Sequence, residues 1–259
     1  MIQHNISFVG AGRVASALCK EIFRAGFNVE LIVSLSEKNG RSLAESCNAS
    51  WSPEPLFPVT IDLIIVAVPD HRLKSVLKEI VCSPDTLVAH TAGSIGLDVF
   101  PKPINRKGIF YPLQTFSGGR KVDFKELPIL LESSDQISYE ILEDLAASIG
   151  GKTYSVNSEQ RMMLHLAAVY ISNFTNHLLT RGKQLAHNAG FPFEILYPLL
   201  KETVSKAMDI GPEESQTGPA VRNDRSTIER HLKLLSFSPE MNRIYNDITM
   251  SIIKYHNKL

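Results

Sequence analysis

Apolar and polar positions divide the first part of the chain into short apolar runs and longer segments with helical spacing. Apolar runs at 5–12, 28–35, 61–69, 86–94, 126–133 and 152–156 predict strands. Between them, apolar residues recur every three to four positions in segments 13–26, 37–47, 70–81 and 137–150, as in amphipathic helices. Strands that are apolar throughout are typical of a parallel sheet covered by helices on both faces. Residues 1–155 therefore predict an α/β domain.

Residues 156–259 contain no convincing strand and predict an all-helical second domain, with the boundary near 155–158. Within it, "HLAAVYISNFTNHLL" (165–179) is mostly apolar but carries several polar side chains. At about 100° per residue, His165, Ser172, Asn173 and Asn176 fall on one helical face. An unpaired buried amide costs roughly 1–3 kcal/mol. The face therefore either meets water or neighbouring backbone, or borders a cleft for a polar ligand.

Composition narrows the function without naming it. The chain has 259 residues, with 27 Lys and Arg against 27 Asp and Glu, so nothing favours a nucleic-acid or anionic-membrane partner. No basic start leads into a long apolar stretch, and no run approaches the roughly 18 apolar residues of a membrane span. Three dispersed cysteines indicate reduced thiols. We expect a cytoplasmic protein with no metal site, because the eight histidines lack ligand spacing.

The glycine pattern "VGAGRVA" is the strongest chemical signal, because it follows a predicted strand and opens a predicted helix. In a dinucleotide site of this kind, Gly10 allows the tight turn and Gly12 lets the backbone approach a pyrophosphate. Arg13 and Val14 then begin the helix, whose positive end faces the phosphates. A tight turn without a ligand is the alternative, and the strand–turn–helix context makes it the weaker one.

The end of the second predicted strand indicates which dinucleotide fits. An NAD site usually places Asp or Glu there to bind the ribose 2′-hydroxyl. Here Ser34 and Ser36 are followed by the cations Lys38 and Arg41, which suit a 2′-phosphate, and Arg13 adds another cation. The alternative is that these cations are solvated and Glu37 binds a 2′-hydroxyl. The sequence favours NADP (NADPH) over NAD.

Together these motifs resemble a known superfamily. "VGAGRVA", "IIVAVPD" (64–70), "HTAGS" (90–94) and the helical second half are similar to 6-phosphogluconate dehydrogenase, ketopantoate reductase and pyrroline-5-carboxylate reductase. "FYPLQTFS" (110–117) and "TGPAVRNDRSTIERHL" (217–232) further resemble Rossmann-like oxidoreductases with a C-terminal domain of unknown function. The resemblance implies a Rossmann-type dinucleotide-binding domain at 1–155, a helical substrate and dimerisation domain at 156–259, and a homodimer. It does not imply a substrate.

The resemblance also implies roles for particular residues. Val68 and Pro69 would lie beside the dinucleotide, and Gly93 and Ser94 near the nicotinamide. Related dehydrogenases carry a Lys on the long helix where this chain has His165. His165 could protonate a carbonyl or imine as hydride arrives. Asn173 and Asn176 would orient the substrate carbonyl or the nicotinamide amide.

Two further segments offer substrate contacts. Tyr111, Gln114 and Thr115 lie in "FYPLQTFSGG" and are candidates to line the cleft. Arg222 and Asp224 form either a substrate clamp or an ion pair that fixes their loop, and "STIE" suggests a capping box with Ser226 as N-cap. The predicted function is an NADP-dependent oxidoreductase of a small carbonyl or imine, or of the corresponding alcohol or amine. The alternative is a non-catalytic NADP-binding sensor or scaffold.

Overall fold

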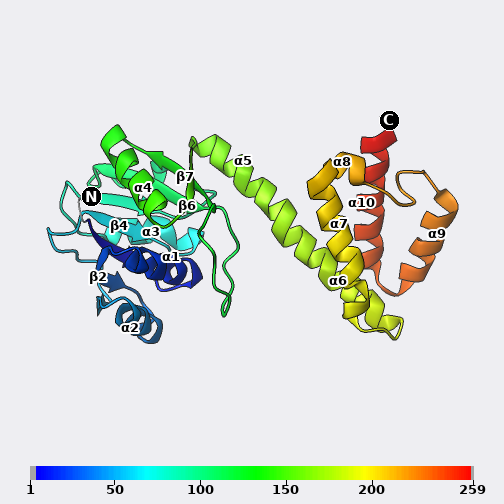
Figure 1. Ribbon diagram of the computed structural model, residues 1–259, viewed down its shortest axis with the longest axis horizontal. Helices are drawn as coiled ribbons and strands as arrows, with labels where there is room; N and C mark the ends of the chain where they lie inside the picture. Colours follow the sequence, from blue (N-terminus) through cyan, green and yellow to red (C-terminus); the bar gives the residue numbers. More distant parts are fainter. Residues whose placement is uncertain (1–3, 258–259) are drawn as a thin grey trace. The chain divides into compact units, whose positions relative to one another are not determined.

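The computed structural model describes residues 4–257 and divides into two compact units (Figure 1). The division falls between Asn173 and Phe174. The boundary expected at 155/156 instead coincides with the end of the last strand. The first helix after that strand therefore belongs, by its contacts, to the first unit.

The first unit contains an eight-stranded sheet in the order β3-β2-β1-β4-β5-β6-β7-β8. β6 and β7 pair antiparallel, and the other neighbouring strands pair parallel. The predicted α/β class is thus confirmed, with one antiparallel pair that the apolar pattern does not reveal. The strands are β1 (Asn5–Val9), β2 (Asn28–Val33), β3 (Ser50–Ser52), β4 (Leu63–Val66), β5 (Leu87–His90), β6 (Arg106–Pro112), β7 (Pro128–Ser133) and β8 (Lys152–Ser155).

Helices cover both faces of this sheet, which explains why its central strands are apolar at every position. In β4, Leu63 and Ile65 pack into one core cluster, whereas Ile64 and Val66 pack into another. Buried residues of α1, α2 and α4 join the first cluster, and those of α3 join the second. These helices are α1 (Arg13–Arg24), α2 (Glu37–Ser46), α3 (Asp70–Glu79) and α4 (Gln136–Ser148), with a short 3-10 turn η1 (Leu97–Val99).

Two strands escape the sequence pattern for local reasons. β3 is three residues long, too short to show a period. β6 begins with "RKG" and ends in proline, so its ends resemble a loop. Phe110 at its centre is nevertheless fully buried, and Tyr111 follows it at the carboxyl end of the strand. The segment that contains Tyr111 is therefore core strand up to Pro112, and loop only after it.

The helix predicted around His165 is not regular. It comprises α5 (Ser158–Ala168), a π-helical stretch η2 (Val169–Phe174) and α6 (Thr175–Asn188). A π-helix closes wider i→i+5 turns, so the 100° projection does not hold across η2. The common face expected for His165, Asn173 and Asn176 rested on regular α-helical geometry and is corrected here. A π-turn leaves no mark in the apolar pattern, which is why the sequence does not predict it.

Among the residues of the second unit that the structure describes, helices joined by loops are present and no strand is, which confirms the prediction of a helical domain. Its own core cluster is small, built on Ala220, Ile228 and Ile253. Across residues 4–257, none of the helices is both long enough and apolar enough to cross a membrane. After α6 come η3 (Phe193–Leu196), α7 (Tyr197–Ile210), α8 (Pro212–Ser215), α9 (Arg225–Leu234), η4 (Leu235–Phe237) and α10 (Pro239–Asn257).

Candidate functional site

The glycine loop joins β1 to α1 at the point where the strand order reverses. The Gly10 amide donates to the Val33 carbonyl at 2.8 Å, and Gly10 has φ +109°. A Cβ there would lie 2.3 Å from the Ala67 carbonyl oxygen, so glycine is required by both space and conformation. Gly12 is the N-cap of α1, and a Cβ on it would meet nothing within 4 Å. The first amides of α1 therefore begin at an open approach.

A cavity of about 410 Å³ lies at this switch point, where open α/β sheets bind ligands. It fits the phosphate and ribose parts of a dinucleotide in position, because the end of β1, the end of β2 and the start of α3 all contribute to its wall. Six residues predicted for the cofactor line it, namely Gly10, Gly12, Ser34, Ser36, Val68 and Pro69.

The residues at the end of β2 and the start of α2 also have contacts of their own. The Ser34 hydroxyl donates to the Ser36 carbonyl at 3.0 Å and accepts from the Trp51 indole at 3.1 Å, so it also holds the turn after β2. Lys38 is exposed on the first turn of α2 and does not line the cavity. Arg41 forms an ion pair with Glu37 at 2.8 Å.

Arg13 and Val14, the other two predicted residues of the glycine loop, lie in different environments. Val14 is half-buried and packs against the first core cluster. Arg13 lines a second cavity, on the other side of the glycine loop. Arg13 therefore stays close to the phosphate approach, whereas Val14 supports α1 from behind.

Tyr111 and His165, predicted separately for substrate and catalysis, lie together in the first unit. The Tyr111 hydroxyl and His165 Nδ1 are 2.9 Å apart, and the two rings meet edge to face with centroids 5.8 Å apart. Gly93 makes room for the pair, because a Cβ there would lie 2.7 Å from both His165 Nδ1 and Tyr111 Cζ. The pair thus stands at the carboxyl ends of β5 and β6.

A carboxylate adjoins this pair. Asp70, at the start of α3, accepts a 2.5 Å hydrogen bond from the Ser94 hydroxyl. Burial raises the pKa of Tyr111, and the negative charge of Asp70 raises it further. Tyr111 therefore keeps its proton at neutral pH and can donate it in the hydrogen bond to His165 Nδ1. In a neutral imidazole, that arrangement leaves the ring hydrogen on Nε2.

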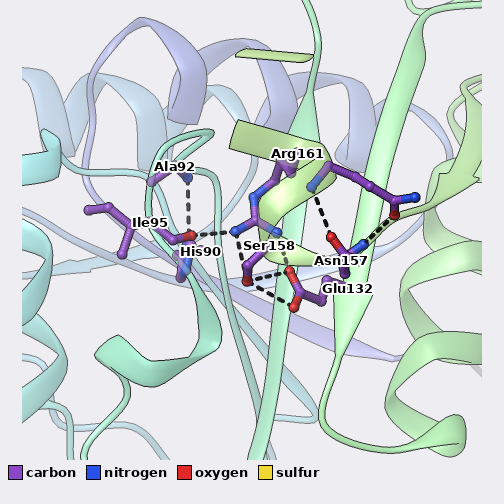
Figure 2. Close-up of polar contacts among 8 residues, drawn as sticks. His90, Ala92, Ile95, Glu132, Asn157, Ser158 and Arg161 are labelled. Atoms are coloured by element: carbon purple, nitrogen blue, oxygen red, sulfur yellow. Dashed lines mark hydrogen bonds and ion pairs between the residues drawn. The ribbon is translucent and has the colours of Figure 1, made fainter. Parts of the chain in front are cut away.

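Arg161 fixes the helix that carries His165. Its side chain is 1% exposed and forms an ion pair with Glu132 of β7 (Figure 2). It also donates to the Ile95 carbonyl at 2.6 Å, and the Ser158 hydroxyl lies 2.9 Å from both oxygens of Glu132. Because His165 lies one helical turn after Arg161, these bonds set its position relative to the sheet.

His90 closes the inner side of this cluster. It is fully buried, stacks on Phe100 with ring centroids 5.4 Å apart, and accepts the Ala92 amide at Nδ1 (Figure 2). Burial, and secondarily the positive charge of Arg161, lowers the pKa of His90 to about 4. His90 is thus neutral at pH 7. The stability that comes from burying the neutral ring is present above about pH 6.5 and is lost as pH falls toward 4.

Other predicted site residues are not part of this cluster. Gln114 is exposed in the loop after β6, where its side-chain oxygen accepts the Thr115 amide. Asn173, in η2, is exposed as well. Within residues 4–257, no group of three or more His, Cys, Asp or Glu could hold a metal ion.

The remaining candidates, Asn176, Arg222 and Asp224, belong to the second unit, and their roles stay predictions. Asp224, and not Ser226, is the N-cap of α9, because its carboxylate accepts the Thr227 amide at 3.1 Å. That correction gives Asp224 a structural task, and the bond lowers its pKa. Among the described residues, no ion pair joins Arg222 to Asp224.

Sequence reasoning missed Asp70, Glu132 and Arg161. Asp70 directly follows "AVP", where a carboxylate at a helix start reads as an ordinary capping charge. Arg161 had a signal, because it lies four residues before His165 in the otherwise apolar "RMMLHL" and so shares its face. Its partner Glu132 is 29 residues away, and no local pattern connects the two.

Comparison with known proteins places this geometry in a family. A Rossmann-like domain matches residues 2–115, and a domain of unknown function (DUF2520) matches residues 127–252. A Bacteroides fragilis protein described as a candidate NADP oxidoreductase is 36% identical, with TM-score 0.89, over 97% of this chain and 98% of its own. The chain therefore belongs to the family of Rossmann-like proteins with this C-terminal domain.

More distant structures share the fold. A protein of Thermotoga maritima is 23% identical, with TM-score 0.72, over 98% of each chain. A 1-pyrroline-5-carboxylate reductase of Streptococcus pyogenes is 16% identical, with TM-score 0.62, over 98% of each chain. No protein of curated function matches this sequence.

We predict that breaking the ion pair between Arg161 and Glu132 causes a large loss of stability. Arg161→Met leaves the Glu132 carboxylate without its cation, and should lower the free energy of unfolding by about 3–5 kcal/mol. Urea denaturation at pH 7 measures this. Arg24→Met breaks an exposed pair with Glu21 and should cost less than about 1 kcal/mol. Equal losses for the two variants would contradict the anchoring role of Arg161.

Proposed function

We propose that this protein is an NADP-dependent oxidoreductase acting on a small carbonyl or imine, or on the corresponding alcohol or amine. The observation that carries the proposal is the hydrogen-bonded pair of Tyr111 and His165, beside Gly93 at the carboxyl ends of the parallel strands. The description of the Bacteroides fragilis relative as a candidate NADP oxidoreductase supports the same activity. A binding module would have no need of such a proton-donating pair.

The residues at the switch point fit a dinucleotide. The open space around Gly12 leaves room for a pyrophosphate on the first amides of α1, whereas Gly10 is closed by the Ala67 carbonyl. When bound, NADPH would supply a hydride to the substrate carbon. The protein's own task is then to hold the substrate and to deliver a proton to its oxygen or nitrogen.

His165 is suited to that proton transfer. With Tyr111 donating to Nδ1, the Nε2–H of His165 is the group available to the substrate. As the substrate oxygen or nitrogen gains negative charge, it takes the Nε2 proton while the Tyr111 hydroxyl proton passes to Nδ1, so the imidazole stays neutral and solvent returns the proton to Tyr111. In the reverse direction, Nε2 of the Nδ1–H tautomer accepts the proton from an alcohol or amine, and Nδ1 returns its own proton to the Tyr111 oxygen. General acid–base catalysis of this kind is worth about 10²–10⁴-fold.

We further propose that NADP is preferred over NAD. At the end of β2, the residues that line the cavity are Val33, Ser34, Leu35 and the N-cap Ser36, and none of them is a carboxylate. Glu37, the carboxylate that could bind a 2′-hydroxyl, is paired with Arg41. The start of α2 together with Arg13 offers amides and a cation to a 2′-phosphate.

The cofactor preference is tested by binding. NADPH should bind more tightly than NADH, and Arg13→Ala should weaken NADPH about tenfold while leaving NADH nearly unchanged. Lys38→Ala tests the exposed cation in the same way. Gly12→Val should abolish the binding of both cofactors and preserve the fold, because its side chain would enter the open approach. If Arg13→Ala and Lys38→Ala each weaken NADPH and NADH equally, neither cation recognises the 2′-phosphate.

The role of His165 is tested with a panel of small carbonyls and imines, by following NADPH oxidation. For any substrate found, His165→Gln should lower kcat by about 10²-fold or more and leave NADPH affinity unchanged. Tyr111→Phe should lower kcat less, because a water molecule can replace the hydroxyl as the proton source for Nδ1. Asn173→Ala and Asn176→Ala should raise KM, lower kcat, or both. Full activity of His165→Gln would overturn the proton-donor role, whereas NADPH binding without turnover of any member of the panel would favour a non-catalytic NADP sensor or scaffold.

We also propose a homodimer that forms largely through residues 156–259. The helices there expose large apolar side chains that their small core does not cover, among them Leu199, Met208, Leu234, Phe237 and Met250. A second copy would bury them. Light scattering at micromolar concentration should give twice the mass of one chain, and Met208→Glu with Leu199→Glu should reduce it to one. A monomeric unmodified protein would rule out this assembly.

A further inference from the structure

A second cavity of the first unit, which we call the basic cavity, contains no residue proposed above for proton transfer, and of its cations only Arg13 is also proposed for the cofactor. Its volume is about 640 Å³, and it lies between the outer face of α1 and the segment 116–124 that follows β6. That volume suits a ligand of nucleotide size. The cavity of about 410 Å³ at the switch point, which we call the dinucleotide cavity, shares Ala11, Gly12 and Asn39 with the basic cavity. The two cavities therefore adjoin at the glycine loop.

Cations dominate the basic cavity. α1 contributes Arg13, Lys20 and Arg24, and the facing segment contributes Arg120 and Lys121. Glu21 is the one acidic residue of its lining, and it is paired with Arg24. Within residues 4–257, no carboxylate forms an ion pair with the other four cations. The whole chain has a formal net charge of zero, so this concentration of charge is local.

The cofactor's pyrophosphate does not account for these cations. Along α1, at 1.5 Å per residue, Lys20 lies roughly 10 Å beyond Arg13, and Arg24 roughly 16 Å beyond it. A pyrophosphate at the helix start occupies only the first turn. The spacing of 13, 20 and 24 nevertheless keeps all three residues along one side of the helix. Two turns of this cationic face are thus left for another anion.

The lining of the basic cavity also has an apolar part. Leu43 and Phe124 are buried at its floor, and Phe116 and Val122 are half-buried on its wall. Gly118 and Gly119 lie between Phe116 and the cations Arg120 and Lys121, and Gly119 has φ +80°. This turn brings the cations of the segment to the same cavity as those of α1.

We propose that the basic cavity binds a phosphorylated small molecule with at least two phosphate groups, separately from the dinucleotide. The guanidinium and ammonium groups on opposite walls hold the phosphates, and the apolar side chains contact the rest of the molecule. The volume of about 640 Å³ favours a small molecule over a nucleic acid or an acidic protein surface. This inference does not depend on the oxidoreductase activity.

Titration calorimetry with inorganic tripolyphosphate tests the proposal on the full chain at low salt, with and without saturating NADPH. We expect one site per chain, weakened at most a few-fold by NADPH through repulsion between neighbouring phosphates. Lys20→Ala/Lys121→Ala should weaken tripolyphosphate at least tenfold and leave NADPH affinity unchanged. The matched control Lys74→Ala/Lys78→Ala removes the same charge from α3, outside the cavity, and should have little effect.

Three results would overturn the proposal. Complete loss of tripolyphosphate binding under saturating NADPH would make the basic cavity an extension of the cofactor site. Equal weakening by the two double variants would indicate general charge attraction. Absence of binding to the unmodified protein would leave the cations without a ligand of this class. If the chain binds no NADPH at all, the proposed function fails, and the comparison of the two double variants on the free protein still decides this inference.

Discussion

The buried guanidinium of Arg161 is the constraint on which the candidate site depends. A charge with 1% exposure is tolerable only when its partners are fixed, and Arg161 finds them in Glu132 of β7 and the Ile95 carbonyl after β5. These partners come from segments far apart in sequence. These contacts therefore hold the start of α5 against the sheet. His165 lies further along the same helix, so its imidazole is positioned beside Tyr111 by a fixed helix rather than by a flexible loop.

The sheet supplies the second constraint, because its order reverses between β1 and β4. At that reversal the loops after neighbouring strands separate, which leaves room for a ligand. Gly10 closes against the Ala67 carbonyl, and Gly12 stays open. Further along the same edge, the ends of β5 and β6 place Gly93 and Tyr111 beside His165. The carboxyl ends of the strands of one sheet thus carry both the cavity at the switch point and the hydrogen-bonded pair of Tyr111 and His165.

The sequence predicts most of this arrangement where the signal is local. Apolar runs locate the central strands, and Gly10 with Gly12 locates the loop, because the strand–turn–helix pattern that identifies the loop lies within a few residues. Tyr111 and His165 are each singled out by type, but their 2.9 Å contact spans 54 positions and follows only from the sheet order. The pairing of Glu132 with Arg161 is not predicted for the same reason. The π-helical turn at 169–174 is missed because apolar spacing is too coarse to register one extra residue per turn.

The glycine loop also determines how charge is divided on the surface of the first unit. On one side, the cavity at the switch point is lined by glycines, small hydroxyls, the N-cap of α2 and apolar side chains, with one cation, Arg72, and one carboxylate, Glu79. On the other, Lys20 and Arg24 continue along α1 beyond the reach of a pyrophosphate, and Lys121 faces them. In a chain of zero net charge, cations gathered in this way repel one another unless an anion lies among them. If both proposals hold, the same helix would present its amide end to one phosphate ligand and its side to another, and α1 would be the element through which each senses the other.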